Sequence, residues 1–205
     1  MKKFILLLLI CATSVVYAQQ RESQYRIEVL PGSGLTITGD TNIRDFLCEY
    51  DIERLEQKHE VFFTEETQRM RFRNTILELR NAGFDCGNKA INRDFHSLLQ
   101  TEDYPIIQLE LKEVRLQKED IAQAIVRITI AGNNKNYEIP VKLLHLNNDK
   151  EEATQRLDGQ LMLNISDFGL EPPKKLFGLI VVKDDIQINF DLHIRKERLP
   201  YASIP

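Results

Sequence analysis

Side chains that could bind a metal or move a proton are few in this chain and widely separated. The four histidines lie far apart in the sequence: His59, His96, His145 and His193. None has a partner at the spacing of a metal site. His145 lies on the same predicted strand face as Val141 and Leu143. It therefore either points inward, near the mouth of a barrel that the strands described below could form, or is a hydrogen-bonded histidine at a strand end. The second interpretation is favoured.

The sequence also lacks the patterns of nucleophilic and phosphate-binding sites. Gly32-Ser33-Gly34 does not have the Gly-X-Ser-X-Gly frame of a nucleophile elbow. No glycine-rich phosphate loop opens a helix. Asp184-Asp185 is typical of a turn before a strand. We therefore predict that the protein is not an enzyme, that it has no catalytic residue or metal site, and that it requires no cofactor.

The first 18 residues have the features of a secretory signal rather than of folded structure. Lys2 and Lys3 precede the apolar run Phe4–Ile10, and Val16-Tyr17-Ala18 supplies small residues at the cleavage positions. The whole apolar stretch is shorter than the ~20 residues that span a bilayer. We predict cleavage after Ala18, a periplasmic or secreted protein, and a single domain over 19–205 that is soluble and does not span a membrane.

Charge limits the partners of this chain. Its formal net charge at pH 7 is −4. Nucleic acids and anionic lipid headgroups both attract positively charged proteins. We therefore expect no nucleic-acid partner.

Two cysteines, Cys48 and Cys86, remain once the signal is removed. An exported chain meets oxidising conditions, where an even number of cysteines favours a disulfide. The alternative is a pair of free, buried thiols. We favour the disulfide, because both cysteines lie at the ends of predicted strands that can run side by side.

Strict alternation of apolar and polar residues predicts strands through most of the chain. The clearest runs are Leu157–Ile165 and Ile186–Ile194, where every second residue is apolar apart from Gly159. Ala122–Ile130 and Tyr137–Leu143 form a predicted hairpin, although Pro140 indicates a bulge or an edge. Further strands are predicted in these segments: Gln24–Leu30, Leu35–Gly39, Phe46–Ile52, Thr75–Leu79 and Ile107–Leu111.

One segment has helical spacing instead. Ile91, Phe95 and Leu98 form an apolar stripe within Asn88–Leu99, and Asn88 is a suitable N-cap. About eight antiparallel strands and one packed helix in one domain indicate an all-β barrel or sandwich, because such strands close on themselves or pair as two sheets.

Several segments together resemble the YceI-like family of exported, lipocalin-like proteins. The resemblance covers roughly Gln24–Ile194, with Asn164 and Ile165 departing from the family pattern. It is carried by these segments: Leu35–Phe46, Phe84–Asn88, Leu98-Leu99, Tyr104–Ile107, Ile128–Gly132, Asn164–Leu170, Pro172-Pro173 and Phe177–Ile180. The resemblance implies an antiparallel eight-stranded, lipocalin-like barrel with one α-helix and a long apolar tunnel. Some members of the family hold a polyisoprenoid chain, such as a quinone tail, in that tunnel.

The predicted function is binding or carriage of a long apolar ligand, an isoprenoid, quinone-type molecule or acyl lipid, inside the barrel. The small residues Gly159, Ala122 and Ala124 lie on the apolar face and are expected to leave room. A polar head is expected at a mouth, near Asp45, Tyr50 or His145. The alternative is a filled barrel that acts through its surface in envelope structure or stress. The candidate ligand-binding residues are Tyr50, Leu77, Leu79, Leu109, Leu111, Val126, Ile128, Ile139, Val141, Leu161, Leu163, Ile188 and Phe190.

Overall fold

A computed structural model describes residues 22–42, 45–148, 152–172, 174–175 and 180–200. The predicted signal, 1–18, lies outside these residues. The structure has one α-helix, α1 (Lys89–Leu98), and three short 3₁₀ helices, η1 (Ile52–Arg54), η2 (Asn81–Gly83) and η3 (Ile165–Phe168). The strands are β1 (Glu22–Val29), β2 (Gly34–Thr41), β3 (Asp45–Tyr50), β4 (Lys58–Glu66), β5 (Arg69–Arg80), β6 (Phe84–Asp85), β7 (Ile106–Lys118), β8 (Ile121–Ile130), β9 (Asn133–Asn148), β10 (Glu152–Asn164), β11 (Lys174–Lys175) and β12 (Ile180–Arg198).

The strands form a closed, eight-stranded antiparallel barrel, as the sequence predicted. Three of its walls are each made of two segments in line, β1 with β2, β3 with β4, and β5 with β6. The chain then continues around the barrel through β7, β8, β9, β10 and β12. Because each wall pairs with the next one in sequence, the topology is a simple up-and-down meander. The sandwich alternative is excluded.

The last strand, β12, closes the ring. Its first half pairs with β2, as far as Asp191 opposite Gly34. Its second half pairs with β1, from Ile194 opposite Val29 to Arg198 opposite Tyr25. The two edges of the meander are thus hydrogen-bonded to each other within the described residues, which closes the ring.

The three two-segment walls are interrupted at one common level. The turn after β1, η1 after β3 and η2 after β5 lie side by side and bond across the breaks. The Val29 N–H donates to Gln57 O and the Asp51 N–H to Gly83 O, each at 2.8 Å. Tyr50 packs flat on Gly83, where an added Cβ would lie 2.6 Å from the Tyr50 ring. The two backbone hydrogen bonds across the breaks satisfy N–H and C=O groups that the sheet ladder leaves unpaired.

Strand alternation sets which residues face the interior. The β4 segment was not predicted as a strand, because its only buried apolar residues, Val61 and Phe63, lie among charged neighbours.

Pro140 is correctly predicted to mark an edge. It pairs in register with Gln123 of β8, while the described ladder between β9 and β10 ends at Val141 opposite Gly159.

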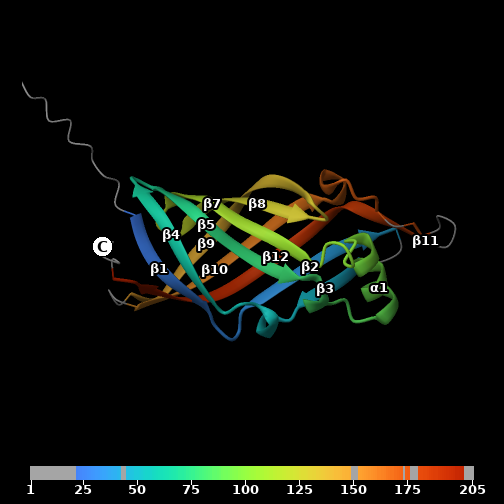
Figure 1. Cartoon of the computed structure of the whole chain (residues 1–205), viewed down its shortest axis with the longest axis horizontal. Coiled ribbons are helices and arrows are strands. Elements are labelled where there is room, and N and C mark those ends of the chain that lie inside the picture. Colours follow the sequence, from blue (N-terminus) through green and yellow to red (C-terminus); the bar gives the residue numbers. More distant parts are fainter. Residues whose placement is uncertain (1–21, 43–44, 149–151, 173, 176–179, 201–205) are drawn as a thin grey trace, which may run out of the picture.

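Helix α1 lies at one end of the elongated barrel, and β1 begins and β12 ends at the other (Figure 1). The prediction of a helix over Asn88–Leu99 is confirmed. The Asn88 side chain accepts hydrogen bonds from Ala90 N at 2.8 Å and Ile91 N at 3.4 Å, as an N-cap should. The apolar face of α1 packs Phe95 against Phe84, with ring centroids 5.2 Å apart.

Candidate functional site

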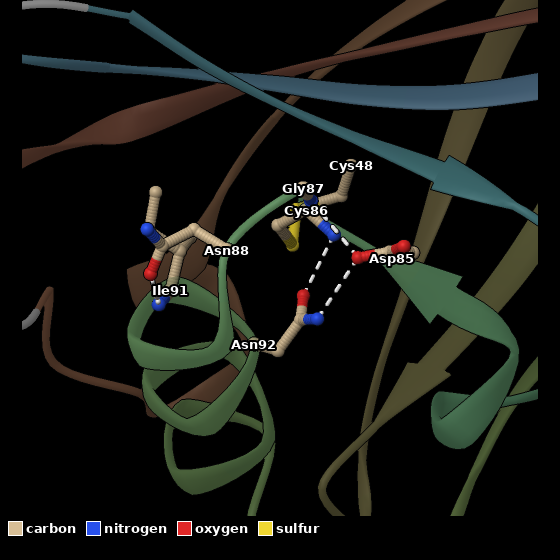
Figure 2. Close-up of a disulfide and its surroundings, with 7 residues drawn as sticks. All are labelled: Cys48, Asp85, Cys86, Gly87, Asn88, Ile91 and Asn92. Atoms are coloured by element: carbon tan, nitrogen blue, oxygen red, sulfur yellow. Dashed lines mark hydrogen bonds between the residues drawn. A yellow bond between two sulfur atoms is a disulfide. The ribbon is translucent and has the colours of Figure 1, made fainter.

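A cross-link lies at the end of the barrel near α1. Cys48 of β3 and Cys86, just after β6, form the predicted disulfide (Figure 2). The Cys86 N–H donates to Asn92 Oδ1 at 2.6 Å, and Asn92 Nδ2 donates to Asp85 Oδ1 at 2.9 Å. These two bonds tie the first turns of α1 to the same segment that the disulfide fixes to the wall.

A second group of contacts seals the gap where β9 and β10 separate. Phe168 of η3 is fully buried there, and its carbonyl accepts a 2.9 Å hydrogen bond from Asn133 Nδ2. Tyr137 Oη donates to Asp167 at 2.8 Å, and Lys135 Nζ lies 2.5 Å from the same carboxylate. Burial and this bond raise the pKa of Tyr137, while the hydrogen bonds from Lys135 and Tyr137 lower the pKa of Asp167.

Strand register places all of the predicted ligand-binding residues on the inner face. Leu77, Leu109 and Ile128 lie opposite one another on β5, β7 and β8. Leu161 and Ile188 do the same on β10 and β12. Whether a ligand touches any of these residues stays a prediction. The fully buried members are Tyr50, Leu79, Ile128, Ile139, Val141, Leu161 and Leu163.

Other inward-facing apolar side chains are only partly buried. A side chain that points into a closed ring stays accessible only where neighbouring side chains do not fill the ring. Such partly buried residues occur along the whole barrel, and inward-facing residues at both ends, such as Leu79 near α1 and Phe63 at the other end, are buried. The partly buried ones include Phe46, Leu77, Leu109, Leu111, Val114, Val126, Tyr137, Leu143, Leu157, Ile188 and Phe190. Incomplete burial is therefore not confined to one end of the barrel.

The expectation that Gly159 leaves room is wrong. An added Cβ at Gly159 would lie 2.3 Å from Cζ of Phe190, so the Phe190 ring already occupies that space. Ala122 and Ala124 are also well buried, with 1% and 8% of their surface exposed. The inward-facing residues that are only partly buried have larger side chains, such as Leu109 and Leu111.

The three predicted polar-head residues do not come together. Tyr50 is buried near α1, where its hydroxyl accepts a 3.3 Å hydrogen bond from the Arg80 N–H, and burial raises its pKa. Asp45 is exposed on the outer face, in line with Leu47. His145 is exposed near the opposite end, on the inner register beside Gln155.

One inward-facing polar residue was missed by the sequence analysis. Lys196 continues the inner face of β12 after Ile194, in register with Ile27 of β1 and Ala153 of β10. The alternation of β12 predicts this inward position, because Lys196 lies two residues beyond Ile194, the last apolar residue of the pattern. It was not followed, since a charged residue usually marks the outer face or the end of a strand.

Two surface hollows accompany the barrel. One, of about 420 Å³, lies between α1 and the loop Gly169–Glu171. The other, of about 280 Å³, lies over β2, β10 and β12 and includes Gly159 and Phe190.

The described residues contain no cluster of three or more His, Cys, Asp or Glu side chains that could hold a metal ion. No helix in the described ranges is long and apolar enough to cross a membrane.

Comparison with known proteins gives consistent matches. The chain matches the YceI-like domain family over residues 22–194. None of the curated proteins compared with it matches its sequence.

Solved structures share the fold at low sequence identity. Burkholderia cenocepacia BcnA is 17% identical, with a TM-score of 0.54 over 78% of this chain and 95% of its own. A polyisoprenoid-binding domain from Saccharophagus degradans, implicated in plant cell wall breakdown, is 11% identical, with a TM-score of 0.55 over 85% and 98%. The Campylobacter jejuni YceI protein is 14% identical, with a TM-score of 0.51 over 63% and 74%.

Proposed function

Because this chain belongs to the YceI-like domain family, we propose that it binds and carries a long apolar molecule inside its barrel. The ligand class is a polyisoprenoid, a quinone-type molecule or an acyl lipid. The observation that carries the proposal is the set of inward-facing apolar side chains along the barrel that are only partly buried. The polyisoprenoid-binding domain from Saccharophagus degradans, which shares the fold, supports the ligand class.

Binding of this kind requires burial and no chemistry. Moving a methylene from water into an apolar interior is worth about 0.8 kcal/mol. Part of that gain is offset by the freedom that a flexible chain loses on binding. A long chain can therefore bind tightly through apolar contacts alone, with inward-facing residues such as Leu109, Leu111 and Val126. We accordingly propose a carrier and not an enzyme.

We further propose that the protein works outside the cytoplasm. Residues 1–18 would direct export and be removed after Ala18, leaving 19–205 as a single domain. The Cys48–Cys86 disulfide supports this location, because disulfides persist mainly in oxidising compartments.

The proposal is tested by filling the interior. Val126 faces inward and is partly buried, while its neighbour Ile125 faces outward between Glu113 and Glu138. Val126→Trp should lower the affinity for geranylgeraniol, a neutral C20 prenyl alcohol, at least tenfold, whereas Ile125→Trp should leave it unchanged. Thermal shift and native mass spectrometry measure this, and urea unfolding confirms that each variant folds.

If Val126→Trp does not fold, Leu111→Phe fills the same region with a smaller change. The proposal is rejected if wild-type protein, purified from a quinone-producing host, carries no lipid and also ignores added geranylgeraniol.

One observation favours the alternative of a filled barrel that acts through its surface. The Phe190 ring covers Gly159, and the α1 end is closely packed. In that case wild-type protein binds no prenyl chain, and the two tryptophan variants differ only in stability.

A further inference from the structure

The wall of the barrel is interrupted between β9 and β10. The described ladder between these two strands ends at Val141 opposite Gly159. Beyond that point, residues 133–140 of β9 are in register with β8, and residues 160–164 of β10 are in register with β12. Within the described residues no ladder joins these two stretches to each other, so two strand edges border a seam in the wall.

Helix η3 fills this seam with apolar side chains. It follows β10 directly, and its Ile165 and Phe168 are buried, with 5% and 0% of their surface exposed. The Phe168 ring stacks on Tyr137 of β9, with ring centroids 6.2 Å apart. The interior beside them is apolar too, since Leu163 of β10 and Ile139 of β9 are buried and face inward. Where the ladder is missing, the short η3 therefore completes the wall.

Side-chain contacts attach η3 to β9. Asn133 Nδ2 donates a 2.9 Å hydrogen bond to Phe168 O, and Tyr137 Oη donates a 2.8 Å hydrogen bond to Asp167. Lys135 Nζ forms an ion pair with the same carboxylate at 2.5 Å. We call Tyr137, Lys135 and Asp167 the latch, because they join η3 to the strand on the far side of the seam.

On its other side η3 is bonded to β12. The Ser166 N–H and Ser166 Oγ donate to the Asp184 carboxylate at 2.8 and 2.5 Å. Polar contacts at exposed positions such as this one contribute little stability and break readily. Helix α1 differs, because the Cys48–Cys86 disulfide fixes the segment before it to β3. The contacts of η3 with the neighbouring strands are noncovalent.

Buried side chains also lie at both ends of the barrel. At the end away from α1, Phe63 is 4% exposed and stacks on Tyr25 with centroids 5.4 Å apart. At the α1 end, Leu79 and Phe84 are each 4% exposed. Side chains packed to this degree have to be displaced before a guest can pass. At the seam, by contrast, one short element covers the wall, and no ladder between β9 and β10 has to break for it to move.

We propose that η3 is a lateral gate: it moves away from β9, and an apolar guest passes between β9 and β10 into the barrel. This inference rests on the proposed function, since it gives the guest its route. The latch holds the gate shut, and Phe168 closes the wall. The ladders of β8 with β9 and of β10 with β12 remain intact when the gate opens, so the barrel stays folded.

A buried thiol reports opening without any ligand. Leu163→Cys places a cysteine on the inner face beside the seam, and Val61→Cys places a similarly buried one near the far end. In protein without the signal it is the only free thiol, because Cys48 and Cys86 form the disulfide. Asp167→Ala removes both contacts of the latch and should speed maleimide labelling of Leu163→Cys about fivefold, as expected when two partly exposed polar contacts are lost. Labelling of Val61→Cys should not change.

Two further variants test the latch itself. Tyr137→Phe keeps the ring on Phe168 and removes one hydrogen bond, so it should speed labelling in the same direction by a smaller factor. Glu197→Gln breaks the Arg26–Glu197 ion pair of 3.0 Å at the opposite end of the barrel. It is the matched control and should leave both labelling rates unchanged.

The gate is rejected if Asp167→Ala speeds labelling of both cysteines equally, which indicates a general loss of stability, or of neither. Urea unfolding confirms that each variant is folded. Leu161→Cys, on the same face of β10 and also buried, replaces Leu163→Cys if that variant does not fold.

Ligand exchange separates the gate from the binding site. Native mass spectrometry follows the exchange of bound geranylgeraniol for its deuterated form. Asp167→Ala should speed this exchange about fivefold and leave the affinity within about twofold of wild type, because an easier route changes association and dissociation alike. A change in affinity with no change in exchange rate would reject the gate. If wild-type protein binds no geranylgeraniol, the proposed function fails and the guest's route with it, even where the labelling rates show that η3 opens.

Discussion

Phe190 and Gly159 show how one residue pair controls the free space of the barrel. The two residues face each other across β10 and β12, and the ring lies where a side chain at 159 would be. Gly159 therefore does not create a cavity; it accommodates a ring that would otherwise project further into the interior. The amount of interior space depends on where that ring lies.

Gly159→Ala should displace the Phe190 ring and destabilise the fold by about 1–3 kcal/mol, as overpacking of a core does. Urea unfolding measures the change. In a Phe190→Leu background the same substitution should cost much less, because the clashing ring is gone. An equal cost in both backgrounds would show that the contact with Phe190 is not responsible.

Charged residues on a strand are where the sequence analysis was least informative. Lys196 was overlooked because charge is normally a sign of the outer face, and only the register with Ile27 shows that it points inward. Asp45 and Tyr50 were both predicted to lie near a polar head at a mouth. Their faces and depths differ, and those depend on how the whole ring closes.

The segment between β6 and α1 is fixed by several contacts. A disulfide joins it to β3, Asn92 bonds to both Cys86 and Asp85, and Asn88 caps the helix. A helix of ten residues is marginal on its own in water, so these attachments, with the packing of Phe95, hold α1 over the barrel end.

Removing the disulfide should therefore destabilise the protein substantially. Cys48→Ala/Cys86→Ala opens a loop of 38 residues, which costs about 4 kcal/mol in the chain-entropy model. Urea unfolding with and without reductant measures this; reductant should lower the stability of wild-type protein and leave the double variant unchanged. Labelling of two thiols in denatured, unreduced mature protein would contradict the disulfide.

At the level of elements, the strength of the alternation decided what could be predicted. The strands after residue 106 and helix α1 follow clear periodicities, and both were identified. β4 has only two strongly apolar inner residues, Val61 and Phe63, among charged neighbours, so its pattern was too weak. That β1 and β2 form one interrupted wall was also hidden, because Pro31 and Gly32 resemble an ordinary turn and the alignment depends on distant β12.

Closure of the whole barrel depends on the first described strand. β1 bridges β4 and the second half of β12 and thereby satisfies the backbone groups of both. The pairing of β1 with β12 joins residues about 170 positions apart, and only the folded chain brings them together.

Deleting residues 22–29 should leave two unpaired edges and a protein that aggregates. Size-exclusion chromatography and thioflavin T fluorescence measure this, with mature protein starting at Gln19 as the control. A truncated protein that elutes and unfolds like the control would show that the ring does not need β1.

Both ends of the described chain lie at the mouth that contains Lys196, away from α1 (Figure 1). If the proposed ligand enters at this mouth rather than at the seam covered by η3, an affinity tag or fluorescent fusion attached next to residue 22 or 200 would interfere with its binding. Immobilisation through such a tag would turn the opening toward the support. An insertion in the turn Thr101–Asp103, which follows α1 at the far end, would leave the entrance clear and is the better site for a reporter.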